Sequence, residues 1–93
     1  MRYIVADDLG VEEQQGTVYL LPAWQAPIRL NRSASLLWGV VAGSGSLGEA
    51  AAGLAAREGV SPERASGLLE PFVRDLIGRA VLRALPGAEG AGQ

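Results

Sequence analysis

Residues 27–38 read Pro-Ile-Arg-Leu-Asn-Arg-Ser-Ala-Ser-Leu-Leu-Trp, and the spacing of apolar side chains changes within this stretch. In Pro27–Leu30 apolar residues flank Arg29, which matches the two-residue period of a strand. Asn31 is a favourable helix N-cap, and apolar residues then follow at helical spacing, namely Ala34, Leu37, Trp38 and Val41. The stretch therefore predicts a short strand that leads directly into a helix.

Two further strands are expected on the N-terminal side. Thr17–Leu21 is rich in β-branched and aromatic residues, and Tyr3–Ala6 has a similar composition. The polar segment Asp7–Gln15 between them is expected to be a connection. Because proline lacks a backbone N–H, Pro27 places the third strand at a sheet edge rather than in the centre.

Two more helices are expected after the first. Ser46 and Glu49 form a capping-box pattern before the second helix, which Gly59 is placed to end. Ser61 and Pro62 start the third helix. Its apolar stripe is wide and comprises Ala65, Leu68, Leu69, Phe72, Val73, Leu76, Ile77 and Ala80. Pro71 is expected to kink this helix or interrupt its hydrogen bonding, and residues 81–83 are expected to be extended.

These elements predict the α+β class with a winged helix-turn-helix-like layout, in which three N-terminal antiparallel strands precede three helices. At 93 residues the chain has room for one domain, expected over residues 1–84. Residues 85–93 are mostly Gly, Ala, Glu and Gln, and are expected to be a disordered tail.

Composition excludes several kinds of function. The chain has no Cys and no His, so thiol and imidazole catalysis and the usual zinc ligands are absent. The acids Asp7, Asp8, Glu12 and Glu13 lie in the predicted connection without the pattern of a buried catalytic pair, and no Gly-rich loop carries a lysine. We therefore expect no enzyme activity, no metal and no cofactor.

Charge and hydropathy limit the kinds of partner and the cellular location that are expected. The eight basic residues are all arginines scattered along a chain of net charge -2, which disfavours nucleic acid as the partner. No apolar run approaches the roughly 20 residues that cross a bilayer. Asp7 and Asp8 come too early for a signal peptide, so a cytoplasmic location is expected.

The order of these pieces resembles the PqqD-like recognition elements of ribosomally synthesised and post-translationally modified peptides (RiPPs). The pieces that carry the resemblance, within residues 3–83, are Val18–Leu21, Ile28–Asn31, Ala34–Trp38, Gly59–Glu63 and Phe72–Leu82. The resemblance implies a non-catalytic domain that binds the leader segment of a precursor peptide as an added β-strand, alongside the third strand and the third helix.

The resemblance also bears on the pathway. Residues 21–26, Leu-Pro-Ala-Trp-Gln-Ala, differ from the Pro-Glu-Arg stretch typical of PqqD itself. The free-standing length and the Leu37–Trp38 pair are similar to leader-binding subunits of lasso-peptide pathways. This similarity implies two partners besides the precursor leader peptide, a transglutaminase-like leader peptidase and an asparagine-synthetase-like cyclase.

The implied peptide site lies along the third strand and the third helix. Its strand side comprises Trp24, Pro27, Ile28, Arg29 and Leu30; its apolar wall comprises Leu69, Phe72, Val73 and Leu76; its rim charges are Arg74, Asp75 and Arg79. Phe72, Val73 and Leu76 fit either core or groove, and Trp24 either contacts the peptide or covers the core. Leu37, Leu68 and Ile77 are expected to be core. A proline in the peptide opposite the backbone of Ile28 or Leu30 is expected to abolish binding.

Two other functions share the layout. A winged-helix DNA-binding regulator has the same order of helices but needs a recognition helix with groove-facing polar residues. In the third helix Arg64, Arg74 and Arg79 are dispersed among acids and glycines. An adaptor that only docks onto a protein through the apolar stripe is the other alternative.

Overall fold

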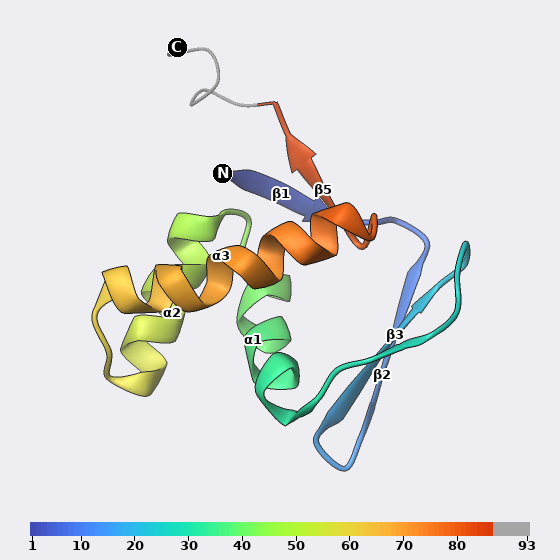
Figure 1. Cartoon of the computed structure of the whole chain (residues 1–93), viewed down its shortest axis with the longest axis horizontal. Helices are drawn as coiled ribbons and strands as arrows, with labels where there is room; N and C mark the ends of the chain where they lie inside the picture. The colour runs from blue at the N-terminus through green and yellow to red at the C-terminus, as the bar shows by residue number, and fades with distance from the viewer. Residues whose placement is uncertain (87–93) are drawn as a thin grey trace.

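The computed structural model describes residues 1–86. Its elements in chain order are β1 (Arg2–Val5), β2 (Leu9–Gln14), β3 (Thr17–Pro22), β4 (Ile28–Arg29), α1 (Arg32–Ala42), α2 (Leu47–Glu58), α3 (Pro62–Gly78) and β5 (Leu82–Leu85). Figure 1 labels all of them except β4. The predicted class is confirmed: antiparallel strands precede three helices in a winged helix-turn-helix-like arrangement.

The main sheet is antiparallel, in the order β2-β3-β4. One of its strands, β2, lies in Asp7–Gln15, so the expectation that this segment is only a connection was wrong. Gln15 and Gly16 form the tight turn between β2 and β3 with φ of 53° and 83°. Positive φ at both central residues is the geometry that matches the twist of a two-residue hairpin.

The N-terminal strand lies outside this sheet. β1 pairs with β5 in a two-stranded ribbon in which Val5 faces Leu82 and Arg2 faces Leu85. The predicted extended segment at residues 81–83 is thus the start of a strand, and Leu85 belongs to it rather than to the tail. Of the rest of the predicted tail, residues 87–93 lie outside the described residues.

The helix ends follow the capping pattern. Asn31, Ser46 and Ser61 are the N-caps of α1, α2 and α3, and each side chain accepts a hydrogen bond from the backbone N–H three residues later. Gly59 ends α2 in the left-handed conformation. α3 continues through Pro71 as a single helix. None of the helices in residues 1–86 combines the length and apolar character needed to cross a bilayer.

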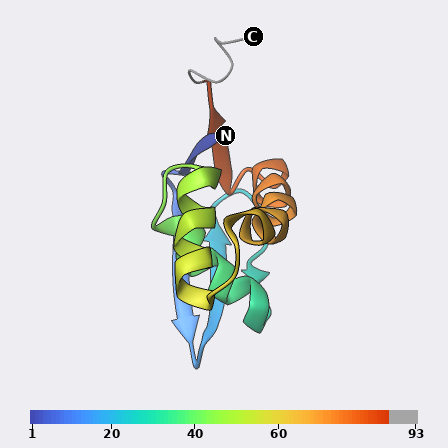
Figure 2. The same cartoon turned by 90° about the vertical axis from the view of Figure 1, so that its left-hand side faces the viewer.

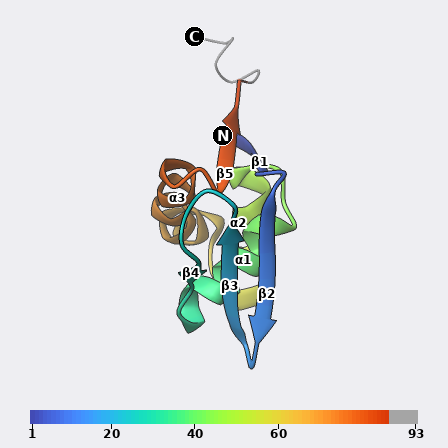
Figure 3. The same ribbon diagram turned by 90° about the vertical axis from the view of Figure 1, so that its right-hand side faces the viewer.

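The core lies between the sheet and the helices. Figures 2 and 3 show α1 and α2 on one face of the β2-β3-β4 sheet, with α3 towards the side of β4. The buried side chains of Leu20, Leu30, Trp38 and Leu69 belong to this core. Tyr3 joins it from β1 and donates its hydroxyl to the carbonyl oxygen of Val41 at 3.0 Å.

Candidate functional site

The edge strand β4 carries the main-chain groups of the candidate site. Arg29 faces Tyr19 and Ile28 faces Leu20 across the β3–β4 pair. The N–H of Leu30 donates to the carbonyl oxygen of Val18 at 2.9 Å. Because main-chain groups alternate in direction along a strand, Ile28 and Leu30 are directed at β3, and the N–H and carbonyl of Arg29 are directed away from it.

This geometry corrects the expected pairing. Leu30 cannot offer its N–H to a guest peptide, since β3 already holds it. Ile28 has the same orientation as Leu30, because they are two residues apart. Arg29 is therefore the residue whose main chain is open, and Pro27, two residues earlier, can offer only a carbonyl.

A buried serine fixes the end of β4. The Ser35 hydroxyl, on α1, accepts from the N–H of Val18 at 3.0 Å and donates to the carbonyl of Leu30 at 3.2 Å. Ser35 is the one polar residue among the buried side chains of residues 1–86. Two main-chain groups at the point where the strand becomes a helix are thereby satisfied.

The apolar residues expected to form the peptide wall divide between core and surface. Leu69 and Val73 are 0% exposed and Leu76 is 1% exposed, so all three side chains are core. Phe72 is partly exposed and packs against that core. Leu68, which was expected to be core, is 52% exposed, and that expectation was wrong.

Several residues of α3 and its C-cap, exposed or partly exposed, form a flank at helical spacing. Leu68, Phe72, Asp75 and Arg79 are separated by four, three and four residues and so share one side of the helix. Arg79 Nε donates to Asp75 Oδ2 at 3.1 Å on this flank. We call these four residues the α3 flank. It combines two apolar side chains with an ion pair.

Arg74 lies on a different side of α3. It bonds Glu70 Oε2 at 2.9 Å through its Nη2 atom. Two residues of helix separate it from Phe72, which corresponds to about 160° around the axis. The structure therefore does not bring Arg74 together with the other rim charges that the sequence suggested.

Trp24 and Gln25 connect the β3–β4 loop to the end of α3. The Gln25 side-chain amide donates to the carbonyl oxygen of Arg79 at 2.8 Å, and the Trp24 indole N–H approaches the same oxygen at 3.5 Å. Trp24 remains 42% exposed. The loop thus spans from the open edge of β4 to α3, and Trp24 does not simply cover the core.

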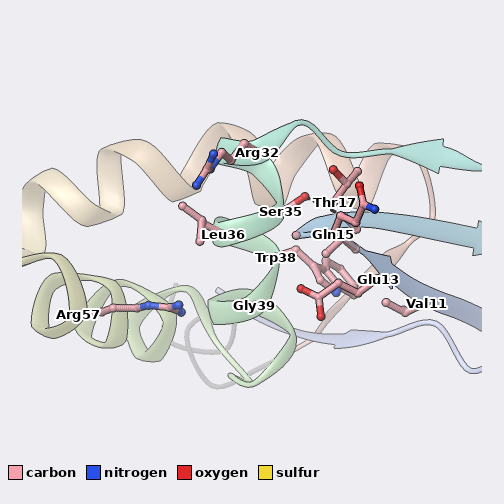
Figure 4. Close-up of a pocket in the computed structure, with 12 residues that line it drawn as sticks. Val11, Glu13, Gln15, Thr17, Arg32, Ser35, Leu36, Trp38, Gly39 and Arg57 are labelled. Carbon is pink, nitrogen blue, oxygen red and sulfur yellow. Dashed lines mark hydrogen bonds between the residues drawn. The ribbon is translucent and has the colours of Figure 1, made fainter.

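Hollows lie between the elements of the part of the chain that the structure describes. The first, of about 630 Å³, is lined by β2, β3, α1 and α2 (Figure 4), and there Arg32 and Arg57 come from the helices and Glu13 from the hairpin. The sequence did not single out these two arginines, because they are distant along the chain. A second hollow of about 410 Å³ includes Trp24 and Ile77, and a third of about 400 Å³ includes Leu68.

Tyr3 is a titratable residue of the core. Burial, followed by the negative charge of Glu49, raises the pKa of Tyr3 above its ordinary value of 10.0, but the Tyr3 hydroxyl is committed to Val41 in the core. Among residues 1–86 no three acidic side chains gather closely enough to hold a metal ion.

Comparison with known proteins places this geometry in context. A family model described as "Coenzyme PQQ synthesis protein D (PqqD)" matches residues 16–82. No curated protein sequence matches the chain. A solved structure of TbiB1 in complex with the TbiA(beta) leader peptide has a similar fold, with a TM-score of 0.75 and 18% sequence identity over 90% of this chain and 99% of the matched chain.

Proposed function

Because the chain belongs to the PqqD family, we propose that it is a non-catalytic module that binds the leader segment of a precursor peptide as an added strand on β4, beside α3. The observation that carries this proposal is the outward direction of the Arg29 main chain at the open end of the sheet. Strand addition takes affinity from main-chain hydrogen bonds and specificity from contacts with alternate side chains.

Side chains around the edge support this proposal. A guest strand on β4 would lie between Ile28, which is half-buried, and the α3 flank, where Phe72 and Leu68 expose apolar surface. Partly exposed apolar side chains next to free backbone groups are the surroundings that β-augmentation requires. TbiB1, which has the same fold, was solved with a leader peptide bound.

The other free edge of the sheet is less suitable. β2 is longer than β4, but its residues Val11–Gln14 are all exposed. Two of them, Glu12 and Glu13, are acidic, and charges on an edge strand oppose pairing with another chain. Strand length therefore favours β2, and the neighbouring apolar surface favours β4.

The DNA-binding alternative is disfavoured by the pairing of charges on α3. In a winged-helix regulator this helix would present free arginines to a groove. Arg74 and Arg79 are instead engaged with Glu70 and Asp75. Their positive charges are locally balanced, which weakens attraction to phosphate.

We further propose that the pathway makes a lasso peptide. In this proposal the bound precursor passes to a transglutaminase-like leader peptidase and then to an asparagine-synthetase-like cyclase. The Leu37–Trp38 pair, which is similar to leader-binding subunits of lasso-peptide pathways, supports this part of the proposal. Reconstitution tests it: the peptidase should cleave its precursor faster when the full chain is added, and an unchanged rate would contradict the proposed delivery.

Amide exchange tests the strand addition itself. In the free protein the Arg29 amide should exchange rapidly and the Leu30 amide slowly; a saturating leader peptide should slow Arg29 and leave Leu30 unchanged. A peptide with proline at the residue opposite Arg29 should lose binding, because proline has no N–H to donate. Slow exchange at Arg29 before any peptide is added would overturn the proposal.

A further inference from the structure

The outer face of the sheet carries a row of three side chains that ends at the open edge. Glu12 faces Tyr19, and Tyr19 faces Arg29. Directly opposed residues on neighbouring strands project from the same face of a sheet. Because Val18 and Leu20 on either side of Tyr19 are buried, this row of an acid, an aromatic residue and an arginine lies on the face of the sheet turned away from the core. Figure 3 shows α1 and α2 on the other face of the sheet.

The Arg29 guanidinium at the end of this row forms no ion pair within the described residues. Both ion pairs found in residues 1–86 lie within α3. Glu12 is two strands away from Arg29, which is about 10 Å, and its carboxylate accepts from Gln14 Nε2 at 3.1 Å. Arg29 is exposed, and the next place in the row lies beyond the edge of the sheet.

The register of an added strand decides which guest side chain lies next to Arg29, beyond the present edge of the sheet. A guest residue that exchanges main-chain hydrogen bonds with Arg29 lies directly opposite it and projects from the same outer face. Its two neighbours in the peptide project from the inner face, where Ile28, Leu30 and Phe72 lie. One register thus places one guest side chain beside a cation and the flanking two beside apolar surface.

We propose that Arg29 selects peptides with an acidic residue at this position, flanked on both sides by apolar residues. The inference rests on the proposed strand addition and defines the class of peptide segment that is bound. Opposite charges that face each other across two paired strands stabilise the pairing only modestly. Arg29 therefore determines preference and register, and the main chain supplies most of the affinity.

A peptide-display selection tests this inference. A library of random 14-residue peptides is selected against the full-length wild-type chain and against Arg29→Glu, with Arg57→Glu as a control of equal charge change on α2. Asp and Glu should be enriched between two apolar positions with the wild type and with Arg57→Glu. Lys and Arg should replace them with Arg29→Glu. The same enrichment with all three proteins, or a loss of acid preference with Arg57→Glu, would overturn the inference.

Titration of one selected peptide separates this inference from the proposed function. Arg29→Glu should weaken binding of the acidic peptide about tenfold, since like charges then face each other, and changing the peptide's acid to Lys should restore it. Arg29→Gln, which removes the charge without reversing it, should give a smaller loss. If the peptide slows exchange at the Arg29 amide but its affinity does not depend on these charges, only the charge preference would be overturned. An Arg29 amide that stays fast would overturn the strand addition.

Discussion

The Ser35 hydroxyl donates a hydrogen bond to the carbonyl oxygen of Leu30 at 3.2 Å, across the point where β4 turns into α1. The Ser35 hydroxyl oxygen in turn accepts a hydrogen bond from the backbone N–H of Val18 on β3 at 3.0 Å. One buried side chain of α1 therefore connects both strands next to the open edge. The position of Arg29, one residue before Leu30, depends on this connection.

Replacing Ser35 by alanine should destabilise the fold and weaken peptide binding together. The change leaves a buried N–H and a buried carbonyl without partners, which costs about 1–3 kcal/mol. Urea denaturation measures the loss, and peptide titration measures the affinity. Ser33→Ala, at an exposed position of the same helix, is the matched control and should stay within about 0.5 kcal/mol of wild type. Equal stability of the two variants would contradict the role of Ser35.

Phe72→Ala should mainly reduce peptide affinity, whereas Leu69→Ala should mainly reduce stability. Phe72 is partly exposed on the α3 flank, so its loss should reduce peptide affinity by roughly tenfold with a smaller effect on stability. Leu69 is 0% exposed, and its replacement should cost about 2–5 kcal/mol of stability while folded molecules still bind. Calorimetric melting beside peptide titration distinguishes them. Parallel losses in both variants would mean that Phe72 is merely core.

The strand and helix periods gave the class of the fold, but one strand was not recognisable. β2 is an edge strand with Val11–Gln14 in water, so its sequence lacks the apolar alternation that marks a half-buried strand. Its turn, Gln15-Gly16, differs from the Asn-Gly and Asp-Gly pairs that signal a hairpin. Its pairing with β3 across the turn stabilises it, together with the packing of Leu9 against the core.

The candidate site was predictable in place but not in detail. The sequence located β4 and α3, because the alternation in residues 27–30 and the wide stripe of α3 are local patterns. Which backbone groups of β4 are free depends on the register with β3, which no local pattern fixes. Exposure of Leu68 likewise depends on how α3 is rotated against its neighbours. The spacing of four residues between Leu68 and Phe72 was the one available signal that they share a side.

Trp24 should report peptide binding by its fluorescence. It is 42% exposed near the end of α3, whereas Trp38, the other tryptophan, is 5% exposed. If the peptide covers Trp24, leader binding should shift the emission of the wild-type protein to shorter wavelength, because the indole leaves water. Trp24→Phe, which keeps Trp38, should remove the shift. A shift of equal size in that variant would assign the change to the core and not to Trp24.

Stability should fall at alkaline pH because of Tyr3. Burial and the charge of Glu49 raise its pKa above 10.0. As pH rises past the ordinary value, the unfolded chain loses the phenol proton while the folded chain keeps it. The folded state then binds more protons than the unfolded state, so the free energy of unfolding decreases with pH. Below about pH 9 the Tyr3 phenol keeps its proton in both the folded and the unfolded chain. It should therefore add no pH dependence to the free energy of unfolding there.

Tyr3→Phe separates this effect from other alkaline changes. The variant loses the hydrogen bond to Val41 and should be about 1 kcal/mol less stable at pH 7. Its stability should nevertheless fall less than that of the wild type between pH 9 and about pH 11, because no phenol remains to ionise on unfolding. Tyr19→Phe, at a partly exposed position of β3, is the control and should keep the wild-type decline. Urea midpoints across this range measure both curves, and parallel decline of wild type and Tyr3→Phe would rule out Tyr3 as the cause.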